Sequence, residues 1–433
     1  MMGRQSIRRQ AMVITLGNGL VRGMGFFLRM MISRLLGPEA MGLMELAGSA
    51  HSLAITPAAS GLPGAVSRLT ARGKEEDRPL ILLAGRQLAM GTGGVLMIFY
   101  LLFSPWIGWL LGEEGVLPAL WLGAPSILLI GLSSVYDGAF FGRGSPWPPT
   151  ISELSEQVIR LFRSLPLLMG LQGLTAPWRA AIPALAGTAG EGIGLVVVAV
   201  WMGRIRPGTA RMEKLPAIRR ELASLSLPLM LNRLSHTALR ALSSAMIPQR
   251  LMAAGLPRGE ALSRMGMLSG MVFPLLFLPG LFTGALSTAG GPAMARCRSH
   301  RAQRRLMGRL MLPALGVGLG AAGLLYLSAP LIAFRFYRLP ELAPLLRTMC
   351  PMAALLSVQQ AAGGMMTGLG LQKKALFASL LGAAAQLFCT WLWTANPSLH
   401  IFGAGNAYLV GHGLGLLGTL IPLLMHVFQQ DKV

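Results

Sequence analysis

Long apolar segments alternate with short polar breaks along the whole chain. A stretch of about 20 apolar residues is long enough to cross a bilayer as a helix. Twelve segments reach this length: 10–36, 42–66, 80–111, 117–142, 149–171, 178–202, 222–248, 266–290, 308–332, 345–368, 374–394 and 403–427. Turn residues separate them, as at Gly37-Pro38 and Gly144-Ser145-Pro146. The pattern predicts an all-α polytopic membrane protein with about twelve transmembrane helices.

The composition agrees with this class. The chain is 53% hydrophobic and only 12% charged, whereas a soluble domain carries about 25% charged residues and a disordered chain is poorer in apolar side chains. A basic soluble nucleic-acid binder would show its charge on a polar background, so we expect no nucleic-acid partner. The first apolar run contains Arg22 and Arg29 and lacks a small-residue cleavage site. We expect it to be a retained membrane helix rather than a signal peptide.

The net charge of +22 comes from 38 Lys and Arg against 16 Asp and Glu. When loops and adjoining span ends are sorted by side, 24 basic residues lie on the side of the N-terminus and eight on the other. The remaining six fall inside spans. Cytoplasmic loops carry an excess of Lys and Arg. The bias predicts a multi-pass protein of the cytoplasmic (inner) membrane with both termini in the cytoplasm.

Two stretches of the chain match weakly at one spacing. Gly42–Arg72 and Gly266–Arg296 both begin at glycine, carry a proline in mid-span and end in Ala-Arg, at an offset of 224 residues. The prolines are Pro57 and Pro279, which we take as candidate helix breaks or hinges because proline removes a helical hydrogen bond. With six spans in each half, both copies have the same orientation.

This repeat predicts two pseudo-symmetric six-helix bundles, related by an axis along the membrane normal, with the binding site between them. The N-terminal lobe is expected at 1–203 and the C-terminal lobe at 222–433. The segment 204–221 is basic and contains two prolines. We expect it to be a cytoplasmic linker.

The arginines inside the spans are the sharpest signal for function. A charge at mid-bilayer costs about 2.5–3.5 kcal/mol on insertion scales. Arg22 and Arg29 are seven residues apart and therefore share a helix face, on which Asn18 also lies. Arg233 and Arg240 repeat the spacing in the first span of the second lobe. Because an arginine fork binds phosphate oxygens, these five residues are predicted to line a central substrate-binding cavity for an anionic group.

A second polar group lies on the fifth span and its neighbours. Its members are Glu153, Glu156, Arg160, Arg163, Asp137 and Glu191. The four on the fifth span form one helical stripe, and Glu156 stands four residues before Arg160, the favourable order for an ion pair. Two interpretations stay open: a structural ion-pair network that holds the lobe together, or part of the cavity wall.

Signatures of catalysis are missing from the sequence. There is no Gly-Lys-Ser/Thr phosphate loop, no HExxH and no GxSxG, and the histidines and the three cysteines are scattered. We therefore expect a transporter rather than an enzyme, with no cofactor and no metal site. The coupling ion, if there is one, is left open.

Four stretches resemble a known family. They are Gly17–Leu43, with Arg29-Met-Met-Ile-Ser-Arg34-Leu-Leu-Gly-Pro; Ala58–Arg68; Phe140–Arg160; and Glu260–Pro274. In order and spacing they resemble the multidrug/oligosaccharidyl-lipid/polysaccharide (MOP) exporter superfamily. More narrowly, they are similar to its branch of stage V sporulation protein B and polysaccharide biosynthesis flippases.

The resemblance implies a MATE-like fold in which two six-helix bundles alternate access. It implies transport of lipid-linked, pyrophosphate-bearing saccharides from the inner to the outer leaflet. Related lipid II flippases line a central cavity with arginines on the first helix of each lobe, and Arg22, Arg29, Arg233 and Arg240 occupy comparable places. The implied partners are the lipid-linked saccharide, membrane lipids and envelope-synthesis enzymes.

Three functions follow as hypotheses. The first is a flippase or exporter of a lipid-linked anionic saccharide for the cell envelope or spore cortex. The second is an ion-coupled multidrug (cation) antiporter, which needs a membrane acid such as Asp137 or Glu191. The third is a membrane scaffold or enzyme of envelope assembly without transport, for which Glu113-Glu114 is the only outer acidic pair in the sequence.

Overall fold

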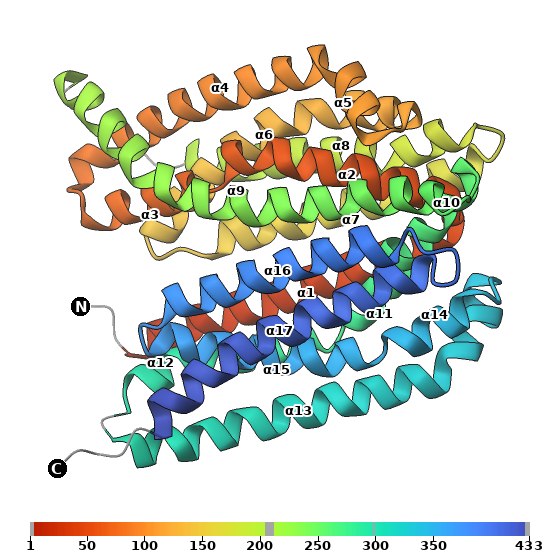
Figure 1. The fold of residues 1–433 in the computed structure, drawn as a ribbon. Helices are drawn as coiled ribbons and strands as arrows, with labels where there is room; N and C mark the ends of the chain where they lie inside the picture. The colour runs from red at the N-terminus through yellow and green to blue at the C-terminus, as the bar shows by residue number, and fades with distance from the viewer. Residues whose placement is uncertain (1–3, 204–211, 298, 429–433) are drawn as a thin grey trace. The chain divides into compact units, whose positions relative to one another are not determined.

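The computed structural model describes residues 4–203, 212–297 and 299–428, except the side chains of 4–16, 18 and 232. These residues are almost entirely helical, and none of them lies in a β-strand (Figure 1). Up to the middle of the chain the elements are α1 (Arg4–Leu36), α2 (Pro38–Ala59), α3 (Leu62–Arg72), η1 (Glu75–Asp77), α4 (Arg78–Leu102), α5 (Ser104–Leu111), η2 (Glu114–Val116), α6 (Leu117–Gly142), α7 (Trp147–Gly170), α8 (Ala176–Gly203), η3 (Met212–Lys214) and α9 (Leu215–Ala253). They are followed by α10 (Arg258–Met265), η4 (Gly266–Val272), α11 (Phe273–Phe277), α12 (Gly280–Ala295), α13 (His300–Leu331), η5 (Ile332–Tyr337), α14 (Leu342–Met349), α15 (Pro351–Gly368), α16 (Gln372–Trp393) and α17 (Ile401–Phe428).

The predicted class, an all-α polytopic membrane protein, is confirmed. Each of the twelve predicted spans overlaps a helix or a broken helix pair of the structure. Among the described residues, seven helices are long and apolar enough to cross a membrane by composition alone, and the bent segment Arg258–Ala295 makes an eighth. The other predicted spans correspond to α1, α2–α3, α7 and α9, which carry charged residues within their length. Their charges lower the mean hydropathy without shortening the helices.

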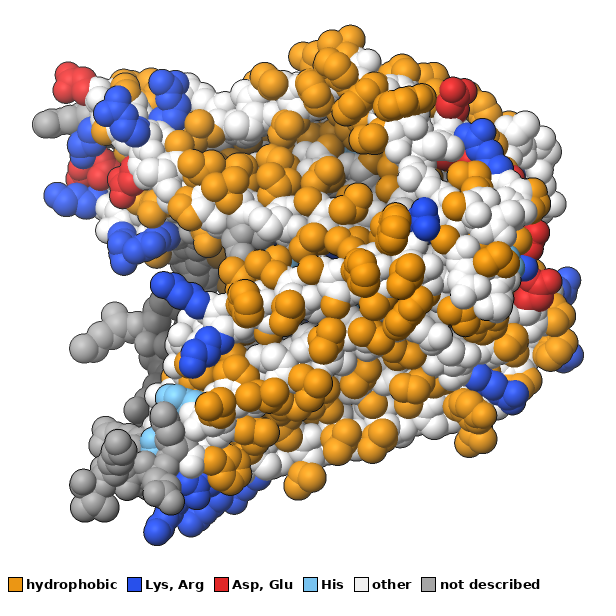
Figure 2. Space-filling model, viewed as in Figure 1, with side chains coloured by type: hydrophobic (Ala, Val, Ile, Leu, Met, Phe, Trp, Pro, Cys, Tyr) orange, Lys and Arg blue, Asp and Glu red, His pale blue; other side chains and the backbone are white. Residues whose placement is uncertain are grey.

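The surface is that of a protein embedded in lipid. On the face in Figure 2, hydrophobic side chains cover the lengths of the helices, while Lys and Arg gather at their ends. Large apolar residues are exposed along α4 and α13, among them Val95, Leu102, Leu312 and Leu327. In water such continuous apolar surface would be unfavourable. In a bilayer it contacts acyl chains.

Internal packing divides the chain into two compact units, residues 1–245 and 246–433. The boundary falls inside α9, so most of this helix packs with the first unit. The predicted lobes, 1–203 and 222–433, follow the internal repeat rather than the packing, and they stay a prediction. Of the predicted linker 204–221, residues 204–211 lie outside the described residues, and α9 already begins at Leu215.

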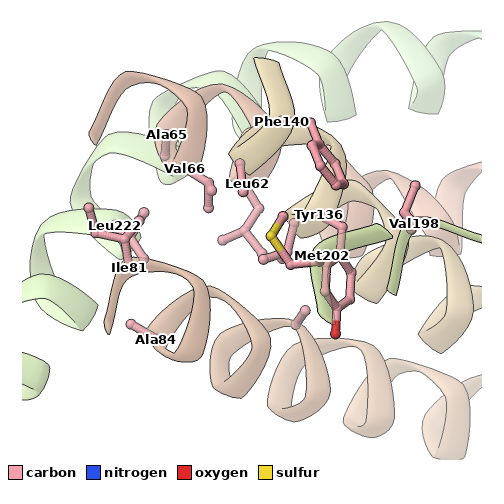
Figure 3. Packing of buried hydrophobic residues seen from close by; sticks show 13 residues of the cluster. Leu62, Ala65, Val66, Ile81, Ala84, Tyr136, Phe140, Val198, Met202 and Leu222 are labelled. Atoms are coloured by element: carbon pink, nitrogen blue, oxygen red, sulfur yellow. The ribbon is translucent and has the colours of Figure 1, made fainter. Parts of the chain in front are cut away.

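The first unit is held together by small residues and a buried apolar cluster. Figure 3 shows this cluster, to which Val66 of α3, Ile81 of α4, Phe140 of α6, Met202 of α8 and Leu222 of α9 contribute. A side chain on Gly138 of α6 would collide with α3, because its Cβ would lie 2.5 Å from a backbone oxygen there. Membrane helices can approach this closely only where residues are small.

The chain breaks between α2 and α3, and the residues of this break, Ser60 and Gly61, line the cavity described below. Pro57 lies inside α2, and the helix ends two residues later. Gly61 then takes φ +94°, and a Cβ there would lie 2.3 Å from the carbonyl oxygen of Ser226 in α9. Glycine is required for both reasons, since other residues strongly disfavour this φ and any side chain would push α9 away.

The second unit follows the same packing rule. Gly368 of α15 lies against Gly291 of α12, where an added Cβ would be 2.0 Å from the Gly291 oxygen. Gly382 of α16 meets α17 in the same way. The structure places Pro279 between α11 and α12, whose segments are bent by 53°. A seven-residue π-helix, η4, directly precedes α11.

Candidate functional site

One face of α9 carries a polar stripe. Arg233, His236, Thr237, Arg240 and Ser244 recur at helical spacing and all line one cavity of the first unit. Leu229 and Ala241 complete the same face. The stripe combines the two predicted arginines of this helix with hydrogen-bonding groups that the sequence prediction did not assign.

The cavity has a volume of about 1400 Å³. The residues of its wall come from α1, α2, α3, α6, α7, α8 and α9, together with the break at Ser60-Gly61. In the first unit, α9 runs alongside α2 (Figure 1), and the hydroxyls of Thr56 and Thr237 lie 3.2 Å apart across this boundary. The space is large enough for a ligand well above drug size.

Arg29 of α1 reaches the cavity and forms an ion pair there. Its guanidinium donates a hydrogen bond to Glu45 Oε1 of α2. The Arg29 side chain is 40% exposed and that of Glu45 is 17% exposed, so both charges are in contact with the cavity. Glu45 lies inside the predicted span 42–66. An acid within an apolar span was therefore the signal that could have marked it.

Arg160 of α7 is the only residue of the second polar group that lines the cavity among the residues described. It pairs with Glu191 of α8, and its Nη2 lies 3.8 Å from Glu156 Oε2. Two glycines of α8 make room for this network: a Cβ on Gly190 would lie 3.1 Å from the Arg160 side chain, and one on Gly194 would overlap Glu156. Three of the six predicted residues are thus brought together.

The other three residues of the second polar group are Asp137, Glu153 and Arg163. Asp137 of α6 is within electrostatic range of Glu153 and Glu191, and its Oδ1 is buried without a hydrogen-bond partner among the described residues. Glu153 is within range of Arg22. Arg163 is exposed and forms no ion pair within the described part of the chain.

Of the residues predicted to line the central cavity, the structure places some in the cavity wall and others outside it. Arg29, Arg233 and Arg240 line the cavity, whereas Arg22 is exposed and does not. The side chain of Asn18 lies outside the described residues. Neither Arg233 nor Arg240 forms an ion pair with any carboxylate of the described residues. These two arginines therefore leave uncompensated positive charge on the α9 wall.

His51 of α2 also lines the cavity. Its Nε2 lies 2.8 Å from Ser126 Oγ of α6, and its ring packs against Tyr100 with centroids 5.7 Å apart. In the described part of the chain, no group of three or more His, Cys, Asp or Glu residues is placed to hold a metal ion. The expectation that the protein uses no cofactor stays a prediction.

Comparison with known proteins shows the family to which the chain belongs. A family model described as polysaccharide biosynthesis protein matches residues 7–298, more than half of the sequence. The chain belongs to the polysaccharide biosynthesis protein family. It is also 27% identical to stage V sporulation protein B of Bacillus subtilis (strain 168), in an alignment that covers 100% of this chain and 85% of the relative. Membership of the MOP exporter superfamily, which the resemblance implied, is confirmed.

Solved structures of the superfamily share the fold of this family member. A multidrug resistance MATE family transporter of the MOP superfamily, in an inward-facing conformation, matches with a TM-score of 0.76 at 16% identity, over 94% of each chain. A MOP superfamily transporter from Pyrococcus furiosus, whose binding pocket has reversed polarity, matches with a TM-score of 0.63 at 14% identity, over 98% of this chain and 97% of its own. The chain is thus a multi-pass membrane protein with a MATE-like fold.

Proposed function

We propose that this transporter is a flippase for a lipid-linked saccharide that carries a phosphate or pyrophosphate, and that it works by alternating access in the cytoplasmic membrane. The observation that carries the proposal is the pair Arg233 and Arg240, which line a cavity of about 1400 Å³ with no carboxylate partner among the described residues. Charges inside a membrane are retained where they act on a ligand or an ion.

The chemistry of the lining suits a phosphate group. A guanidinium stays charged in the low-dielectric interior and binds two oxygens at once. Thr237, Ser52 and Ser244 add hydroxyl groups to the wall, which can bind sugar hydroxyls. Family membership supports a saccharide substrate, and the partners of such a transporter would be the lipid-linked saccharide, membrane lipids and enzymes of envelope synthesis.

A transport assay tests the proposal. Depletion of the protein is expected to trap a lipid-linked precursor in the inner leaflet, so that an external glycan-cleaving enzyme no longer reaches it. Complementation with Arg233→Ala or Arg240→Ala should restore less than about a tenth of the wild-type signal, because removing a charge-assisted bidentate contact costs roughly 1.5–3 kcal/mol. Full activity of both variants with normal membrane levels would contradict the assignment of the cavity.

The antiporter hypothesis rests on the acids near the cavity. Glu45 lines the wall but pairs with Arg29, and Glu156 and Glu191 are engaged by Arg160. A cation would have to displace an arginine at each of these three acids. Asp137 forms no ion pair among the described residues, but it does not line the cavity. Both facts favour the anionic substrate. Efflux of a cationic dye that is lost in Asp137→Asn or Glu191→Gln would instead favour an antiporter.

A further inference from the structure

Glu45 stands out among the residues that line the cavity. In the described part of the wall it is the one carboxylate, against the four arginines at 29, 160, 233 and 240. Among the described residues, Glu45 forms an ion pair with Arg29 and with none of the other three arginines. Arg160 is held by glutamates behind the wall.

The cavity therefore presents two kinds of anion-binding group. Arg233 and Arg240 on α9 carry no carboxylate partner among the residues described, so a phosphate can bind them directly. Arg29 on α1 is already hydrogen-bonded to a carboxylate from α2. A carboxylate and a phosphate compete for the same guanidinium fork. A substrate phosphate therefore competes with Glu45 for the Nη2 group of Arg29.

We propose that Glu45 is an internal counter-ion that holds Arg29 in the resting transporter and exchanges with the substrate's phosphate, so that Glu45 sets the affinity of the site. The inference rests on the proposed function. Binding begins at the α9 arginines, and transfer of Arg29 from Glu45 to the phosphate joins α1 to the ligand. On release, Glu45 recaptures Arg29 and weakens the grip on the departing group.

Equilibrium binding of radiolabelled inorganic pyrophosphate to the full chain in phosphatidylcholine nanodiscs tests this role. Glu45→Gln removes the competing charge and is expected to lower the Kd about two- to fivefold, the range for a partly exposed ion pair. Glu45→Asp keeps the charge and should stay within about twofold of wild type. Glu39→Gln is the matched control, because Glu39 lies on the same helix, is exposed and does not line the cavity.

A double-mutant cycle separates a specific exchange from general repulsion. If Glu45 acts through Arg29, Glu45→Gln should change the Kd less than about twofold when Arg29 is already alanine. An equal gain in both backgrounds would show that Glu45 only repels anions, and would overturn the proposal. Should Glu45→Gln fail to fold, Glu45→Ala in both backgrounds gives the same comparison.

The two proposals fail in different ways. If the wild-type protein binds pyrophosphate and Glu45→Gln binds it no more tightly, the counter-ion role is wrong while the anion cavity stands. If the wild-type protein and Glu45→Gln both show no binding, the anion cavity itself is wrong, and the role of Glu45 fails with it.

Discussion

The charged residues inside the first unit differ in how their charge is compensated. Arg160 is held by two glutamates, one on its own helix and one on α8. Arg29 pairs with Glu45 on the neighbouring helix. Arg233 and Arg240 have no carboxylate partner among the described residues. Since an unpaired charge is costly in a membrane, the first arrangement favours stability and the last favours a ligand.

Removing Arg160 should therefore damage folding more than removing Arg233 or Arg240, which have no carboxylate partner among the described residues. Arg160→Ala leaves two nearly buried carboxylates without their cation, and we expect a loss of about 2 kcal/mol in the free energy of unfolding, reduced from the fully buried case because Arg160 is partly exposed. Thermal unfolding of the detergent-solubilised protein measures it. Arg163→Ala, an exposed site on the same helix, is the control and should leave the midpoint unchanged.

A further substitution makes that prediction specific. Adding Glu156→Gln and Glu191→Gln to Arg160→Ala removes the orphaned charges and should recover most of the lost stability. If the triple variant unfolds at the same temperature as Arg160→Ala, the ion pairs do not hold α7 against α8, and the loss came from packing.

At the scale of elements, glycines decide how closely helices approach. Gly61 both turns the chain between α2 and α3 and lets α9 lie against this break. Gly190 and Gly194 let α8 accept the side chains of α7. In each case the small residue allows a close approach between helices that a larger residue would prevent.

Gly61→Ala is expected to destabilise the first unit and to disturb the cavity. The backbone of Gly61, with φ +94° and ψ −48°, lies in a region that costs an alanine roughly 1–3 kcal/mol, and the added Cβ collides with the backbone of α9. We expect a lower unfolding temperature together with weaker pyrophosphate binding. Gly91→Ala in α4, where a Cβ would meet nothing within 4 Å, serves as the control. An equal effect of Gly91→Ala would show that the backbone conformation and close contact of Gly61 are not the cause.

The bend at Pro279 sets the angle between the segments on either side of it. If it is a hinge for alternating access, Pro279→Ala should slow transport several-fold while pyrophosphate binding stays within about twofold, because hinge residues lie away from the ligand. Pro292 lies inside the continuous helix α12, and Pro292→Ala is the matched control. Unchanged transport in Pro279→Ala would reject the hinge.

For the whole molecule, the distribution of basic residues predicts the orientation. Of the 38 Lys and Arg, the predicted topology assigns 24 to the side of the N-terminus, eight to the other side and six to the spans. Alkaline phosphatase, which is active only outside the cytoplasm, should be inactive when fused at either terminus and active when fused after Glu113. Fluorescent-protein fusions should give the reverse pattern. An active phosphatase at the C-terminus would contradict an even number of spans.

The sequence by itself determined the helical class, the twelve spans and the presence of arginines within them. These properties are local, since the length of an apolar run and the spacing of residues along one helix do not depend on neighbours. The pairing of Glu156 with Arg160 was predictable for the same reason.

Only the tertiary structure decided which charges share a space. Helical spacing placed Arg22 and Arg29 on one face, yet only Arg29 lines the cavity. Arg160 reaches the same cavity from α7, and Glu45 meets Arg29 from α2. The spacing of residues along a helix predicts which of them share one face. Which helix packs against that face depends on contacts between segments that are distant in the sequence.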